Sequence, residues 1–265
     1  MLRELEARLI VTKTAALVAL MLALAAAHVL AVPITVDGDP SDWGVAPGPW
    51  HSSQWEPLDG VQGTWPPAEA DHPDDRGGGR VRPGYGGQLF DAEAIYATTD
   101  GATAYFGVVT GLPPHGARGE EPGDIILAFD ADGPWTHAIE TTGDHGLVTG
   151  ALYADVTWTP GLWGDASDPA AIAAGTALWT PESPNLGYAP TSGHHFFIEV
   201  AIPLGQLPVS PDHTTQFRAH WTQTCGNDAV DMAGQLPVHH APEPTTLALL
   251  GCAVAGLAAR RRRRR

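Results

Sequence analysis

Apolar and polar residues alternate over short stretches along most of the chain, and no long apolar repeat of helical spacing runs through its middle. In residues 103–109 every second side chain is apolar, and the Asp100-Gly101 pair just before them is a favoured hairpin turn. Residues 125–129 form a continuous apolar run, as expected for a strand buried on both faces. These patterns predict antiparallel strands. We expect strands at 34–36, 94–98, 103–109, 125–129, 135–141, 147–153, 196–202 and 217–223, and single helical turns at 41–43 and 204–207.

Turn-forming residues recur between these stretches, in a chain of 265 residues that contains 31 Gly and 24 Pro. The predicted fold is an all-β antiparallel β-sandwich, jelly-roll-like, with long loops. Residues 32–241 are enough for one such domain with a sizeable core. Residues 45–88 show no strand pattern and are rich in Pro and Gly. We expect them to form one long loop, which is either functional or partly disordered.

The first 31 residues have the pattern of a secretory signal peptide. Arg3, Arg8 and Lys13 precede an apolar stretch at 15–27, and small residues favour cleavage before Val32 or after 25–27. The alternative is an uncleaved membrane anchor. The apolar stretch is short for that role, because a membrane-spanning helix needs about 20 apolar residues.

The C-terminus combines three features in a fixed order: Pro242-Glu243-Pro244, an apolar stretch at 247–259, and arginines at 260–265. A helix over 247–259 would span only about 20 Å, less than a hydrocarbon core of about 30 Å. The arginines are expected to stay on the cytoplasmic side, which leaves the preceding domain outside. The alternative, a polyarginine tail for nucleic acid, is disfavoured because the arginines directly follow a membrane-grade apolar segment.

This order of features closely resembles the PEP-CTERM sorting signal of Gram-negative bacteria. The resemblance covers residues 242–265, with Pro242, Glu243, Pro244, Arg260 and Arg261 as the signal residues. It implies export, transient anchoring in the inner membrane, and processing near Pro-Glu-Pro by an exosortase. The processed protein is then expected at the cell surface or outside the cell.

The charge of the middle segment limits its partners. Residues 32–241 contain five basic and 27 acidic residues, with no lysine. Such a surface repels phosphate, which excludes nucleic acid as a partner, and it attracts divalent cations, of which calcium prefers oxygen ligands. Cys225 is the one cysteine left when the C-terminal segment is removed, so an internal disulfide is excluded.

Several acidic pairs predict a structural calcium site. Two of them lie at turns, where alternate carboxylates precede or flank a glycine, and a third lies at the edge of a predicted strand, where i, i+2 spacing places both side chains on one face. Asn227 and Asp228 add oxygen donors. The alternative is that Asp-Gly pairs only form turns, and the 130–141 loop lacks the final Glu of an EF-hand. The predicted ligands are Asp37, Asp39, Asp91, Glu93, Asp130 and Asp132.

Residues 34–43 (ITVDGDPSDW) resemble the first strand of family 9 carbohydrate-binding modules and of the related DOMON-like sandwiches. Residues 105–109, 198–203 and 217–228 fit the same plan. The resemblance implies a β-sandwich of this size with structural calcium and, in some relatives, a sugar site.

Tryptophans in the predicted loops are candidates for sugar recognition, because a flat apolar ring stacks on the C–H face of a pyranose. The alternative is that these rings cover a thin core. The candidate ligand-binding residues are Trp50, Trp55, Trp158 and Trp163.

No catalytic motif is evident: the chain lacks a Gly-x-Ser-x-Gly elbow, a P-loop, a dinucleotide fingerprint and zinc-ligand spacing. A pair of carboxylates at glycosidase spacing carries little information among the 27 acids of residues 32–241. We therefore predict a non-enzymatic protein of the cell surface or extracellular matrix, stabilised by calcium and binding extracellular polysaccharide. The alternatives are a purely structural surface protein and a secreted polysaccharide-active enzyme.

Overall fold

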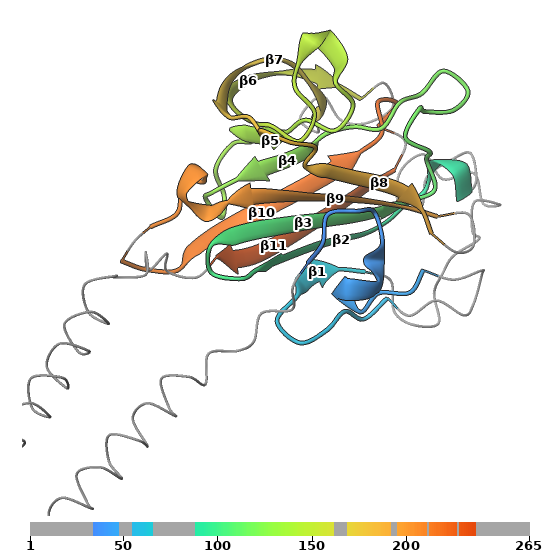
Figure 1. Cartoon of the computed structure of the whole chain (residues 1–265). Coiled ribbons are helices and arrows are strands. Elements are labelled where there is room, and N and C mark those ends of the chain that lie inside the picture. Colours follow the sequence, from blue (N-terminus) through green and yellow to red (C-terminus); the bar gives the residue numbers. More distant parts are fainter. Residues whose placement is uncertain are drawn as a thin grey trace, which may run out of the picture. The chain divides into compact units, whose positions relative to one another are not determined.

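The computed structural model describes residues 34–47, 55–65, 88–161, 169–191, 195–210, 212–226 and 228–236. In these ranges the protein is built from strands and short 3-10 turns, and it contains no α-helix (Figure 1). The strands form two antiparallel sheets, with orders β1-β2-β3-β9-β8 and β11-β10-β4-β5-β6-β7. The predicted all-β sandwich is confirmed.

The two sheets contain eleven strands in the described residues, which also include four 3-10 turns. The first sheet contains β1 (Gln62–Thr64), β2 (Ala92–Thr99), β3 (Thr103–Thr110), β8 (Leu186–Pro190) and β9 (Phe196–Pro203). The second contains β4 (Ile125–Ala128), β5 (His137–Ile139), β6 (Leu152–Pro160), β7 (Pro169–Trp179), β10 (Thr215–Thr222) and β11 (Ala229–Leu236). The 3-10 turns are η1 (Pro40–Trp43), η2 (Gln88–Phe90), η3 (Asp144–Gly146) and η4 (Leu204–Gln206).

The main core lies between the two sheets, where every second residue of the central strands is fully buried. Phe106 of β3 and Phe217 of β10 meet edge to face across it, with ring centroids 5.9 Å apart. The period of two in the sequence therefore marks the inward face, as strand geometry requires. The Asp100-Gly101 turn is also confirmed: Gly101 has a φ of 89°, and Asp100 Oδ1 accepts from the N–H of Thr103 at 2.7 Å.

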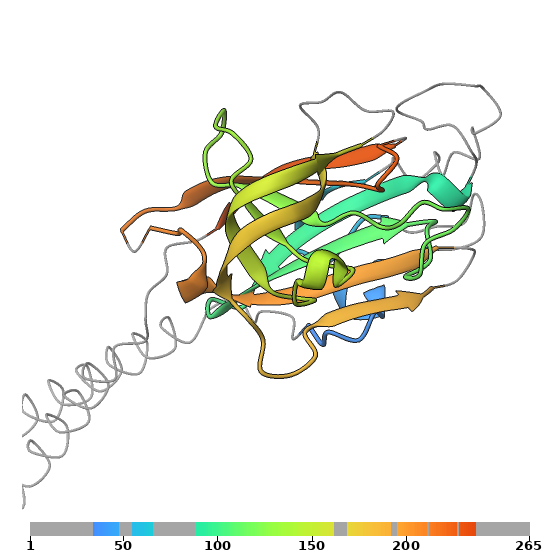
Figure 2. The same cartoon turned by 90° about the horizontal axis from the view of Figure 1, so that it is seen from above.

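A second, smaller core lies on the far face of the six-stranded sheet. It contains Ile126, Ala138, Ala151, Tyr153 and Ile172, and it packs under the strongly curved β6–β7 hairpin (Figure 2). The curvature follows from shifts of register along the β6–β7 pairing, where Asp155 adopts a positive φ of 51°.

A buried carboxylate ties the start of β7 to β4. Asp124 precedes β4 and accepts the N–H of Ile172 at 2.7 Å and the N–H of Thr141 at 2.8 Å. Burial raises the pKa of Asp124 well above its usual range, and the nearby Glu140 raises it further.

Some expected elements differ from the observed ones. Residues 34–36 do not form a strand, since the backbone that follows bonds to side chains. The sixth predicted strand, 147–153, is mostly a turn, because Gly150 has a φ of 77° and β6 begins only at Leu152. The structure also contains β1 inside the predicted 45–88 loop, and β7, β8 and β11, which the pattern did not indicate.

Candidate functional site

The segment 34–47 is fastened to the five-stranded sheet by one buried carboxylate. Glu199 of β9 is fully buried. Its Oε1 accepts the N–H of Asp37 at 2.6 Å and of Gly38 at 2.5 Å, and its Oε2 accepts Trp43 Nε1–H at 2.8 Å. Trp43, which lies in η1, is itself fully buried and meets Phe197 edge to face at 5.7 Å. One side chain therefore positions both the turn and the 3-10 turn that follows it.

The surroundings of this contact raise the pKa of the Glu199 carboxyl. Burial raises the pKa of Glu199 to about 7, although the three N–H donors act in the opposite direction. The nearby Asp42 adds to the rise. Burial also raises the pKa of Asp42, which accepts the N–H of Thr35 at 2.6 Å. Glu199 of β9 and Asp42 of η1 thus bind protons more strongly in the fold than they do in water.

Gly38 permits the close approach of this segment to β8. It has a φ of 85°, and a Cβ added to it would lie 2.5 Å from the Ala189 Cβ. A larger residue would push the 37–41 turn away from the end of β8. The turn and the strand end therefore enclose a small space between them.

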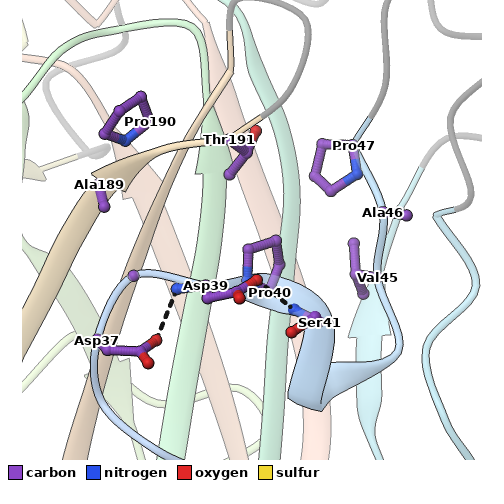
Figure 3. Close-up of a pocket in the computed structure, with 11 residues that line it drawn as sticks. Asp37, Asp39, Pro40, Ser41, Val45, Ala46, Pro47, Ala189, Pro190 and Thr191 are labelled. Atoms are coloured by element: carbon purple, nitrogen blue, oxygen red, sulfur yellow. Dashed lines mark hydrogen bonds between the residues drawn. The ribbon is translucent and has the colours of Figure 1, made fainter.

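That space is a pocket of about 450 Å³ between the segment 37–47 and residues 189–191 (Figure 3). Asp37 Oδ1 accepts the N–H of Asp39 at 2.9 Å, and Asp39 Oδ1 accepts the N–H of Ser41 at 3.0 Å and caps η1. Both aspartates are exposed. The apolar part of the lining comes mainly from prolines and small side chains. The lining residues are Asp37, Gly38, Asp39, Pro40, Ser41, Val45, Ala46, Pro47, Ala189, Pro190 and Thr191.

Chemically, this pocket offers carboxylate and hydroxyl oxygens beside proline rings. The carboxylates can accept hydrogen bonds from ligand hydroxyls or bind a cation, and the exposed Pro190 ring can pack on C–H groups. Sequence reasoning selected Asp37 and Asp39 but missed Pro190, Thr191 and Glu199. The one available signal for Glu199 was a lone acid within an otherwise apolar strand.

The second predicted calcium pair lies in a loop whose carbonyl oxygens contact a cationic side chain of the protein itself. Asp130 and Asp132 are exposed, and Asp130 Oδ1 accepts the N–H of Asp132 at 3.3 Å. The guanidinium of Arg218, in β10, donates to the carbonyl oxygens of Asp130, at 3.3 Å, and of Gly133. It also lies 4.4 Å from the centre of the Trp135 ring. Two carbonyl oxygens that a bound ion could use are therefore already engaged.

The side chains of the third predicted pair, Asp91 and Glu93, are largely buried. The pairing of β2 with β3 shifts its register between Ala92 and Ala94. Asp91 hydrogen-bonds to the carboxyl of Asp228, whose pKa burial raises and this bond lowers. Glu93 Oε1 lies 3.3 Å from His195 Nε2. Among the described residues, no three His, Cys, Asp or Glu side chains converge as metal ligands. Calcium binding stays a prediction.

The tryptophans predicted to bind sugar differ in how far their rings are buried. Trp55 is only 1% exposed and packs edge to face on His195 at 5.4 Å, which contradicts its predicted stacking role. Burial on this scale leaves no ring face for a sugar. Trp158 is partly buried against the second core. Trp50 and Trp163 lie outside the described residues.

The C-terminal prediction is supported by a comparison with known families. Residues 240–264 match the PEP-CTERM protein-sorting motif. This range contains Pro242, Glu243, Pro244, Arg260 and Arg261, which lie outside the described residues, as does the predicted signal peptide. The motif marks the chain as an exported substrate for processing by an exosortase, with its destination at the cell surface or outside the cell.

No curated protein and no solved structure matches the chain. The resemblance of residues 34–43 to family 9 carbohydrate-binding modules therefore stays a prediction. In the part of the chain that the structure describes, no helix is long and apolar enough to cross a membrane.

Proposed function

We propose that this exosortase-processed surface protein binds a neutral extracellular polysaccharide, without catalysis, in the pocket between residues 37–47 and 189–191. The carrying observation is the composition of that pocket, where the exposed carboxylates of Asp37 and Asp39 lie beside the exposed ring of Pro190. Sugars need hydrogen-bond acceptors for their hydroxyl groups and apolar surfaces for their C–H faces, and this pocket provides both. Its volume of about 450 Å³ is suited to one or two sugar rings.

The charge of the domain supports a neutral rather than an acidic polymer. Residues 32–241 carry 27 acidic and five basic side chains, so an anionic polysaccharide would be repelled over much of the surface. Calcium is the second element of the proposal: bound at Asp37 and Asp39, it would offset their mutual repulsion and coordinate sugar hydroxyls.

The pocket is tested with the double variant Asp37→Asn/Asp39→Asn, whose amide oxygens can keep both turn hydrogen bonds. Screening on a glycan array selects the polysaccharide, and calorimetry then measures its affinity. We expect the double variant to bind about tenfold more weakly, which corresponds to about 1.4 kcal/mol, with an unchanged melting temperature. Each titration is repeated with calcium and with sodium chloride at equal ionic strength. A gain in affinity that is specific to calcium is expected.

The matched control is Asp130→Asn/Asp132→Asn, which removes the same charge from another exposed turn. It is expected to bind like the wild type. Equal weakening in both double variants would indicate a general charge effect, and a protein that binds no glycan would contradict the proposal. Release of reducing sugar would favour an enzyme instead.

Processing gives a separate prediction. The extracellular form is expected to lack Arg260 through Arg265, because the sorting motif directs cleavage near Pro242-Glu243-Pro244. Intact-mass measurement of the protein recovered from the native host decides this. Replacing the three motif residues by alanine should leave the arginines in place and retain the protein in the membrane fraction. An intact arginine tail on the extracellular wild-type protein would refute the prediction.

A further inference from the structure

A second pocket, of about 360 Å³, lies over β10 and β11, apart from the first pocket between residues 37–47 and 189–191. Gln216 and Arg218 line it, and they alternate along β10 with residues of the main core. They therefore point to the outer face of the six-stranded sheet. Gln235 of β11 lies directly opposite Gln216 and shares this face. The volume is within the range of about 300–1,000 Å³ that is typical of small-molecule sites.

The second pocket contains an adjacent pair of carboxamides, those of Gln216 and Gln235. Both side chains are exposed, and within the described residues no hydrogen bond occupies either carboxamide. The backbone N–H and C=O of Gln235 bond to the Gln62 side chain, both at 2.7 Å, and thus point away from β10. Gln216 and Gln235 are therefore a non-hydrogen-bonded pair, in which the side chains lie closest together. Together they can donate to and accept from neighbouring hydroxyl groups of one ligand.

The guanidinium of Arg218 is held in place beside these carboxamides. Its Nε and Nη2 donate to the carbonyl oxygens of Asp130 and Gly133, and it lies 4.4 Å from the centre of the Trp135 ring. Nη1 takes no part in these bonds, so its N–H groups remain for a ligand. A donor that is fixed in advance loses little conformational entropy when a ligand binds.

The charges around the second pocket indicate the chemical class of its ligand. None of the described residues that line it is acidic, whereas two aspartates line the first pocket, so a cation finds no carboxylate here. Exposed Asp130 and Asp132 lie on either side of the lining residue Ala131, and they disfavour an anion beside Arg218. Donors and acceptors without a net charge to satisfy fit the hydroxyl groups of a neutral saccharide.

The two pockets lie on opposite outer faces of the sandwich. The segment 34–47 bonds to Glu199, which alternates along β9 with residues of the main core. The first pocket therefore lies outside the five-stranded sheet, and the second lies outside the six-stranded sheet. Sheets that pack face to face are about 10 Å apart, so each pocket holds a saccharide of its own.

We propose that the second pocket binds a neutral saccharide unit through Gln216, Arg218 and Gln235, so that one protein molecule holds two polysaccharide chains and cross-links them. This inference rests on the proposed function, since it assigns the same class of polymer to both pockets. Binding at the second pocket needs no calcium, unlike binding beside Asp37 and Asp39. Two sites on one molecule join neighbouring chains into a network.

Calorimetry of the processed protein with neutral tetrasaccharides of glucose, galactose, mannose and N-acetylglucosamine counts the sites. The wild type is expected to bind two molecules of the tetrasaccharide that it recognises. Gln216→Ala/Gln235→Ala should lose one of them, the one that binds without calcium. The matched control Gln206→Ala removes another exposed carboxamide and should still bind two. Melting temperatures check that each variant is folded.

The outcomes separate this inference from the proposed function. A single bound tetrasaccharide that Asp37→Asn/Asp39→Asn weakens would overturn the second pocket and leave the proposed function in place. A single one that Gln216→Ala/Gln235→Ala abolishes would contradict the first pocket instead, and with it the cross-link. Binding of no tetrasaccharide would overturn both.

Turbidity of the protein mixed with the polysaccharide selected on the glycan array measures cross-linking. The wild type should make the mixture turbid, because each molecule joins two chains. The variant Gln216→Ala/Gln235→Ala should bind the polymer and leave the mixture clear. Turbidity of this variant equal to that of the wild type would contradict cross-linking through the second pocket.

Discussion

Replacing Glu199 by Ala is expected to lower the free energy of unfolding by about 3 kcal/mol, because it leaves three buried N–H donors without an acceptor. These donors are the backbone of Asp37 and Gly38 and the Trp43 indole. The segment 34–47 should detach from β9 and take the pocket with it. Urea denaturation of the processed protein measures the loss. The control Glu182→Ala removes an exposed carboxylate and should change stability by less than about 0.5 kcal/mol.

The same residue makes stability depend on pH in a defined direction. The folded-state pKa of Glu199 is about 7, above its ordinary value of 4.5, so the native state binds more protons between these pH values. The contribution of Glu199 is therefore favourable at low pH and is lost as the pH rises through about 7. Asp124 and Asp228 shift in the same direction. The wild-type protein should thus be more stable at about pH 5 than at about pH 8.

The variant Glu199→Gln separates the pH dependence of stability that Glu199 causes from the part that the other buried acids cause. The Gln oxygen can accept from Asp37 and Gly38, whereas its NH₂ group faces the Trp43 donor, so the variant should be less stable at low pH. Because Gln cannot ionise, the stability difference from the wild type should narrow as the pH rises. Parallel pH profiles for the two proteins would show that Glu199 does not titrate in this range.

Replacing Gly123 by Ala is expected to have an effect at least as large, of about 3–5 kcal/mol. A Cβ at this position would overlap the backbone oxygens of Thr222 and Ala170, which cannot move without breaking strand contacts. The Gly123 carbonyl also accepts Trp221 Nε1–H at 2.8 Å and the Thr141 hydroxyl at 2.7 Å. A displaced backbone would therefore disturb both sheet contacts and a core tryptophan.

Thermal and urea unfolding of this variant measure the effect, with Gly205→Ala as the matched control. No atom lies within 4 Å of a Cβ added to Gly205, and its φ lies outside the left-handed region. The control should be neutral or slightly stabilising, since Ala restricts the unfolded chain. Equal stability of the two variants would contradict the packing described here.

Local sequence signals were sufficient to predict an element when residues close to it along the chain determine its conformation. The β2–β3 hairpin is of this kind, because Asp100 and Gly101 form its turn without distant help. The strand β7 gave no such signal: it is rich in Ala and Gly, which have low strand propensity, and pairing with β6 determines its conformation.

The candidate site was predictable only in part, for the same reason. Asp37 and Asp39 could be selected from their own turn, but the carboxylate that holds this turn is 162 positions away. Trp55 was expected in an open loop, yet it is buried against His195, which precedes β9 far along the chain. Such contacts depend on tertiary packing, which a single sequence pattern does not contain.

In the loop around Asp130, the cation that contacts the carbonyl oxygens is the guanidinium of Arg218, a side chain of the protein itself. A diffusible ion leaves when its concentration outside the cell falls, whereas the guanidinium of Arg218 remains beside the loop carbonyls at every dilution. These bonds therefore couple the order of the loop to the folding of β10. These two bonds need no free cation, so a chelator is expected to leave them in place.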